Sequence, residues 1–155
     1  MKKNQGFSLV ELIVVIAIMA ILVGVLAPAY LRYVEKSRKS TDVSSISDVM
    51  GAAEKVAVDP QYSVKKNTKF TITSDANGNV TCSTDGGNDL TQGFKDVANM
   101  KNGYTMKSTA FKATGTLTGT VGPDGEISWV GGGVFAKTGT DTFGDYSADF
   151  AKKLS

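Results

Sequence analysis

One acidic residue, Glu11, lies near the start of a long apolar segment and could take part in a charge pair. The segment from Phe7 to Ala27 is apolar apart from Ser8 and this carboxylate. An ionised carboxylate in hydrocarbon costs at least about 2 kcal/mol unless a cation meets it. No basic residue lies within two helical turns of Glu11, so the cation must come from outside the segment or be created by processing. Cleavage after Gly6 would create one, because it would leave an ammonium on Phe7 and make Glu11 the fifth residue of the new chain.

Other residue types that carry chemistry are sparse. The chain has no histidine, which excludes a His-based catalytic triad and a His metal site. Its single cysteine, Cys82, cannot form an intramolecular disulfide and is interpreted as a small core or half-buried apolar residue on a strand. Gly131-Gly132-Gly133 is not followed by the Lys-Ser/Thr of a phosphate-binding loop, so we expect a flexible bend. The chain is therefore not expected to be an enzyme.

Two acidic stretches offer hard oxygen ligands. They are the loop 85–89 and the C-terminal aspartates Asp141, Asp145 and Asp149. Neither fits the spacing of an EF-hand, and Asp/Gly loops are mostly turns. We expect no cofactor, with calcium as a minor alternative.

The apolar segment itself predicts a membrane-spanning helix, since about 20 apolar residues suffice to cross a bilayer. Pro28 has no N–H, and its ring crowds the carbonyl four residues earlier, that of Gly24. Gly24 and Pro28 together predict local melting or a kink between them.

The first 40 residues closely resemble the precursor signature of the type IV pilin and pseudopilin superfamily. The resemblance rests on Lys2 and Lys3 in a leader ending at Gly6, an aromatic Phe7, Glu11 at the fifth mature position, and an apolar run broken at Pro28. It implies that a prepilin peptidase cuts between Gly6 and Phe7 and methylates the nitrogen of Phe7. It also implies a helical filament of identical subunits, in which Glu11 of one subunit neutralises the Phe7 ammonium of a neighbour.

Further partners follow from the same resemblance. They are the lipid bilayer, a membrane-embedded assembly platform and its ATPase. The precursor would be a single-pass protein of the plasma (inner) membrane, and the mature subunit would lie in a cell-surface filament. Many relatives hold their C-terminal region with a disulfide, and this chain, with one cysteine, departs from that pattern.

The expected organisation is a leader at 1–6, a membrane and filament-core helix at 7–28, and a head domain at 29–155. The helix should continue through 29–59, because Asp59-Pro60 is a stop signal. The charged stretch 35–42 is interpreted as a solvated face above the membrane. Apolar residues at steps of mostly three or four predict one buried face: Tyr30, Val34, Val43, Ile46, Met50, Ala53 and Ala57.

From Lys69 onward the pattern alternates with a period of two. Strands at 70–73 and 80–83 flank Asn77-Gly78, and strands at 116–121 and 126–130 flank a Pro-Asp-Gly turn. We expect one more strand at 104–112 and a short helix at 90–100. The predicted fold class is α+β, a small antiparallel sheet packed on the distal half of a long helix.

The net charge excludes an electrostatic surface for nucleic acid. Loss of Lys2 and Lys3 would leave 15 basic and 15 acidic side chains. Two alternatives to a surface filament stay open: a pseudopilin of a type II secretion or DNA-uptake apparatus, and a membrane-anchored binding module that never polymerises. An ordinary signal peptide cut after Ala29 is a third, minor alternative, because Ala27-Pro28-Ala29 fits the small-residue pattern of such a site.

Overall fold

The computed structural model describes residues 6–155, and the chain divides into two compact units, Met1–Lys36 and Ser37–Ser155. We call the second unit the head. One helix, α1 (Leu9–Val58), begins in the first unit and ends in the head. This compact unit begins at Ser37, and the head domain expected at 29–155 stays a prediction.

Helix α1 ends where the sequence predicts. The backbone N–H of Asp59 still donates to the carbonyl of Val56, and Pro60 then prevents further helical bonding. The carboxylate of Asp59 accepts the N–H of Gln61 at 2.9 Å, which turns the chain away from the helix.

Within the head, α1 buries one face. Its buried residues recur at steps of three and four: Asp42, Val43, Ile46, Val49, Met50, Ala52, Ala53 and Val56. The predicted stripe is thus confirmed from Val43 onward. Tyr30, which was assigned to the same stripe, is 68% exposed.

The other side of the core is a five-stranded antiparallel sheet in the order β3-β2-β1-β4-β5. Its strands are β1 (Lys69–Ser74), β2 (Asn79–Thr84), β3 (Tyr104–Thr105), β4 (Gly115–Val121) and β5 (Ile127–Gly133). Both predicted hairpins are present, with Gly78 at φ +79° and Gly125 at φ +82° in their turns. These glycines supply the left-handed conformation that such turns require.

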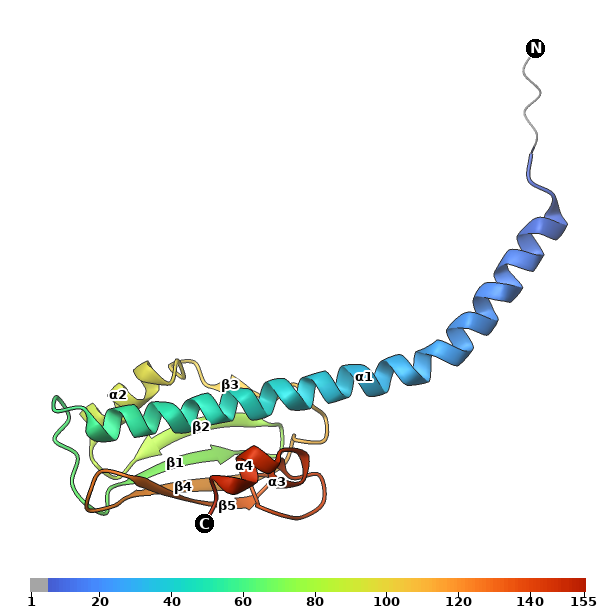
Figure 1. Ribbon diagram of the computed structural model, residues 1–155. Coiled ribbons are helices and arrows are strands. Elements are labelled where there is room, and N and C mark those ends of the chain that lie inside the picture. Colours follow the sequence, from blue (N-terminus) through green and yellow to red (C-terminus); the bar gives the residue numbers. More distant parts are fainter. Residues whose placement is uncertain (1–5) are drawn as a thin grey trace. The chain divides into compact units, whose positions relative to one another are not determined.

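The two layers pack through alternating strand residues. Phe70 and Ile72 on β1 and Leu117 on β4 are fully buried, while their Thr neighbours face outward. In Figure 1 the part of α1 that belongs to the head runs along one face of the sheet. The predicted short helix is α2 (Asn88–Val97), whose Phe94 packs edge-on against Phe70 at 5.1 Å. The α+β prediction is therefore confirmed.

The strand predicted at 104–112 is wrong beyond its first two residues. β3 covers only Tyr104–Thr105, and after Met106 the chain leaves the sheet. The cause is a tertiary contact, because the next backbone N–H groups, those of Lys107 and Ser108, donate to the carboxylate of Asp42 on α1.

The flexible bend predicted at 131–133 is also wrong. These residues end β5 and pair with Gly115–Leu117 of β4. Glycine is needed at Gly131 and Gly133 because other backbone segments pass too close to leave room for a side chain. A Cβ on Gly131 would lie 2.0 Å from the carbonyl oxygen of Phe135, and one on Gly133 would lie 2.2 Å from that of Thr114.

The C-terminal region forms two short helices that the sequence reading did not predict, α3 (Phe143–Tyr146) and α4 (Ala148–Lys152). It returns to the sheet at its end, where Leu154 forms a parallel bridge with Trp129 of β5 and Ser155 N–H donates to the Trp129 carbonyl at 2.8 Å. Four buried aromatic rings hold it from inside: Phe111, Phe135, Phe143 and Phe150. Packing and hydrogen bonds thus fasten this region without a disulfide.

Candidate functional site: the start of the N-terminal helix and its attachment to the head

The predicted cleavage point, between Gly6 and Phe7, lies just before α1. The Phe7 side chain is 93% exposed, and no atom lies within 4 Å of where a Cβ on Gly6 would stand. Nothing among the described residues therefore crowds this peptide bond. The leader residues Lys2 and Lys3 lie outside the described residues.

Glu11 makes a local contact at the helix start. Its Oε2 accepts the backbone N–H of Ser8 at 2.8 Å, and the Ser8 carbonyl accepts the first bond of α1, from Leu12 N–H at 3.2 Å. The Ser8 hydroxyl in turn accepts the N–H of Val10 at 3.4 Å. Ser8 is thus positioned as the helix cap, and Glu11 supplies the acidic half of a capping box.

This cap has a recognisable sequence signal and also positions the Glu11 carboxylate. The signal was present in the sequence, since Ser8-Leu9-Val10-Glu11 has the S-x-x-E spacing, but the sequence reading missed it. The cap also places the carboxylate one residue away from the predicted new N-terminus at Phe7. A carboxylate has about four acceptor positions, so one bond to Ser8 leaves capacity for a cation.

The apolar segment that follows is exposed along its whole length, from Leu9 to Leu26. Its large side chains from Leu9 to Leu26 are 49–73% exposed, and its most apolar 18-residue window has a mean hydropathy of 3.1 with no buried residue. By length and composition the helix could span a membrane. So much exposed apolar surface requires a cover of lipid or of partner helices.

Gly24 and Pro28 lie inside α1, which stays helical through both positions. The segment is therefore not melted in this structure, contrary to one half of the sequence expectation. Pro28 still lacks the N–H that would bond to the Gly24 carbonyl. A weak point here under load stays a prediction.

In the head, sequence reasoning missed the most unusual charged residue. Asp42 was placed in a solvated stretch, yet its side chain is fully buried. Its carboxylate accepts the N–H of Lys107 at 2.9 Å, the N–H of Ser108 at 2.8 Å and the hydroxyl of Tyr104 at 2.5 Å. Burial, together with the bond to Asp42, raises the pKa of Tyr104 to about 12. The phenol therefore remains a hydrogen-bond donor at neutral pH.

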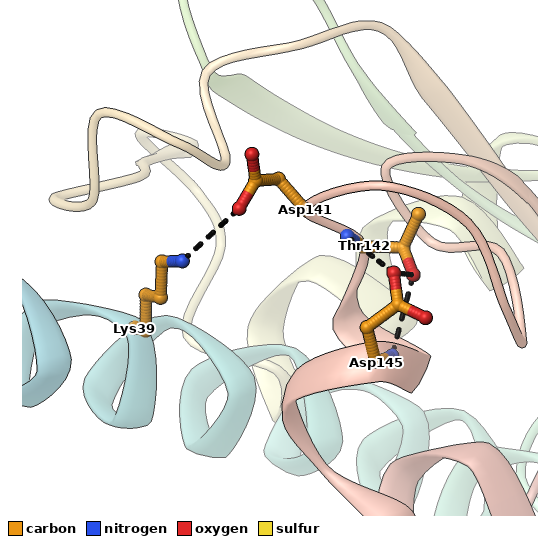
Figure 2. Close-up of polar contacts among 4 residues, drawn as sticks. All are labelled: Lys39, Asp141, Thr142 and Asp145. Carbon is orange, nitrogen blue, oxygen red and sulfur yellow. Dashed lines mark hydrogen bonds and ion pairs between the residues drawn. The ribbon is translucent and has the colours of Figure 1, made fainter.

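A second attachment lies one helical turn earlier, where Lys39 Nζ pairs with Asp141 Oδ1 at 3.3 Å and lies 5.5 Å from the centre of the Phe111 ring. Figure 2 shows this pair beside Thr142 and Asp145 at the start of α3. Asp145 accepts the Thr142 hydroxyl at 2.7 Å and completes a capping box. That bond, followed by the one from Gly139 N–H, holds the pKa of Asp145 below its usual value.

The C-terminal aspartates thus act in different places. Asp141 pairs with α1, Asp145 caps α3, and Asp149 pairs with Lys152 on α4. In the loop 85–89, Asp85 accepts the N–H of Lys69 at 2.7 Å. Across residues 6–155 no three His, Cys, Asp or Glu side chains gather as a metal site would require. Calcium binding stays a prediction from the sequence.

Cys82 is a buried core residue, as predicted. Burial raises the pKa of its thiol to about 11. The side chain therefore stays neutral at physiological pH and is suited to packing rather than to chemistry.

Comparisons with known proteins agree with the arrangement of the helix start. The family model described as the prokaryotic N-terminal methylation motif matches residues 1–27. The chain is 30% identical to the fimbrial protein EcpC of Eikenella corrodens over 130 residues, which are 81% of this chain and 80% of that protein.

Shorter matches are found with two further fimbrial proteins. Identity to a fimbrial protein of Pseudomonas aeruginosa is 34% over 76 residues, which are 46% of this chain and 49% of that protein. Identity to fimbrial protein Q of Moraxella bovis is 42% over 59 residues, 38% of this chain and 34% of that protein. The chain thus aligns with half or less of the length of these two proteins. No solved structure matches the chain.

Proposed function

Because the chain belongs to the type IV pilin family, we propose that it is the precursor of a structural subunit of a type IV pilus-like surface filament. The precursor is cleaved between Gly6 and Phe7, and the mature chain polymerises through its N-terminal helix. The observation that carries this proposal is the exposed apolar part of α1. Near its start lies one carboxylate, that of Glu11, which accepts the N–H of Ser8, and the uncrowded peptide bond after Gly6 comes just before it.

Processing supplies the missing positive charge. A prepilin peptidase hydrolyses the bond after Gly6, which releases the basic leader and leaves an ammonium on Phe7, and then methylates that nitrogen. A methylated amine remains protonated at neutral pH, so it still acts as a counter-charge. The Glu11 carboxylate, oriented by its bond from Ser8, then accepts from the Phe7 ammonium of a neighbouring subunit and sets the register between helices.

Assembly moves the apolar helix from lipid into a bundle of like helices. Both surroundings are apolar, so the transfer itself yields little hydrophobic gain, and packing between helices provides the contacts. The work of extraction must come from elsewhere, and the assembly platform with its ATPase supplies it. The precursor is accordingly held in the inner membrane before the subunit joins the surface filament.

The head supplies the outer surface of the filament. It carries no large excess of either charge, which is consistent with a structural role and with no binding to nucleic acid through charge.

A pseudopilin of a secretion or DNA-uptake apparatus is the second candidate, because it would use the same processing site and helix. The two differ in the product, a long surface fibre or a short assembly within the envelope. The fimbrial relatives favour the surface fibre.

Mass spectrometry of filaments sheared from the cell surface tests the proposal. We expect the chain to begin at Phe7 with one added methyl group on its nitrogen. A chain that begins at Tyr30, or a full-length chain found only in membranes, would contradict it, since the first indicates an ordinary signal peptide and the second a permanent anchor.

A further inference from the structure

Two charged side chains of α1 bind segments of the head that lie far away in the sequence. Asp42 holds the loop after β3 through the N–H groups of Lys107 and Ser108 and the hydroxyl of Tyr104. Lys39 binds Asp141, in the loop before α3. Both contacts lie within the head.

These two residues are three positions apart on the helix, so they lie on the same side of α1. They are also close to where α1 enters the head at Ser37. The fully buried residues that follow them, from Val43 to Val56, are all apolar. Half-buried Ser45 adds one side-chain hydrogen bond among them, to the hydroxyl of Tyr104, which Asp42 also binds. The directional side-chain contacts of Lys39 and Asp42 therefore come before the apolar ones along the helix.

We propose that Lys39 and Asp42 form a clasp that keeps the head attached to α1 when the filament is pulled. This inference rests on the proposed function, because a filament subunit receives load through its N-terminal helix. Load that enters the head at Ser37 reaches Lys39 and Asp42 before it reaches Val43 and the apolar contacts beyond.

The two parts of the clasp differ in strength. Asp42 is fully buried, so its separation from the loop leaves a charge and two amide donors without partners before water can enter. Lys39 and Asp141 are 21% and 60% exposed, so water replaces much of what that pair loses. Asp42 is therefore the main anchor and Lys39 the lesser one.

Single-molecule pulling on the full chain in detergent micelles tests this clasp. Handles are attached through Ser37→Cys on α1 and Ser128→Cys on β5, both at exposed positions. At constant force we expect Asp42→Asn to separate α1 from the head about tenfold faster than the parent chain, because the new amide cannot accept as the carboxylate does. Lys39→Met should have an effect of about twofold to fivefold.

Two controls separate a clasp from a general loss of stability. Asp48→Asn changes an exposed α1 aspartate whose side chain makes no hydrogen bond or ion pair among the described residues, and it should have no effect. Moving the first handle to Ser83→Cys on β2 loads the sheet instead of α1, and in that geometry Asp42→Asn should change the rate by less than about twofold.

Equal rates for Asp42→Asn and the parent chain under load on α1, or equal acceleration in both pulling geometries, would overturn the inference. Because single subunits are measured, the outcome does not depend on filament formation. Failure of the clasp and failure of the filament proposal are therefore distinguishable.

Discussion

At Asp42 a carboxylate lies away from water and is held only by hydrogen-bond donors of its own chain. Replacing it with Ala would leave the N–H groups of Lys107 and Ser108 buried without an acceptor. We expect Asp42→Ala to lower the free energy of unfolding of the head by about 2 to 4 kcal/mol. Urea titration followed by the fluorescence of Trp129, which is buried and is the single tryptophan, measures this.

Tyr104→Phe is the matched variant, because it removes one donor and leaves the carboxylate bonded to both amides. Its cost should be about 1 kcal/mol. If Asp42→Ala cost no more than Tyr104→Phe, Asp42 would not be the centre of this attachment.

Cys82 allows a prediction about reactivity. Burial raises the pKa of its thiol from 9.0 to about 11, so at pH 8 the folded chain holds about a hundredfold less thiolate than the unfolded chain. Alkylation by iodoacetamide at pH 8 should therefore be at least about a hundredfold slower in the folded chain than in urea. Raising the pH toward 11 should speed the folded reaction. Equal rates in buffer and in urea would show that the thiol is not in the core.

Among the secondary-structure elements, those with local signals could be predicted from the sequence. Asn77-Gly78 and Pro-Asp-Gly specify their own turns, and Asp59-Pro60 ends α1. The loop after Thr105 could not be predicted, because its N–H groups bond to a residue more than 60 positions earlier. No local pattern in the loop records that partner.

Two helix-capping signals are present in the sequence but were not used in the prediction. Thr142-x-x-Asp145 and Ser8-x-x-Glu11 both have the spacing of a capping box, and each starts a helix in the structure. The second lies within the candidate site, where Glu11 was considered only as a charge. The apolar segment was predictable because it depends on composition alone, whereas cleavage after Gly6 stays a prediction.

Within α1, Pro28 leads to a prediction for the filament. The helix stays intact there in the structure, but the Gly24 carbonyl receives no N–H from Pro28. Pro28→Ala would restore that bond and should make the fibre less extensible under load. Force–extension curves of single fibres measure this, with wild-type fibres at matched length as the control. Curves that coincide would show that this position does not govern stretching.

At the scale of the whole molecule, the proposed processing at Gly6 can be tested independently of filament geometry. The bond after Gly6 is uncrowded, and the missing side chain lets an enzyme approach it closely. Gly6→Val should leave uncut precursor in the membrane fraction, detectable on immunoblots as a chain that keeps Lys2 and Lys3. Efficient cleavage of the Val variant would show that the lack of a side chain is not what the peptidase requires.

The central claim is that Glu11 serves assembly between subunits rather than anchoring of a single one. In a lone anchor the carboxylate is a liability of about 2 to 3 kcal/mol in the membrane, so Glu11→Leu should improve insertion and leave function intact. In a filament the same change leaves the Phe7 ammonium of a neighbour without its counter-charge, which costs about 3 to 5 kcal/mol in an apolar bundle. Glu11→Gln keeps the volume and the capping bond to Ser8 but loses the charge, so it should fall between the two.

The most direct measurement is the yield of sheared surface fibre relative to cleaved subunit in the membrane, for the wild type, Glu11→Gln and Glu11→Leu. We predict normal cleavage and insertion in all three, with fibre yield that falls in the order wild type, Gln, Leu and is close to zero for Leu. Wild-type fibre yield from Glu11→Leu would contradict the pairing of Glu11 with the Phe7 ammonium.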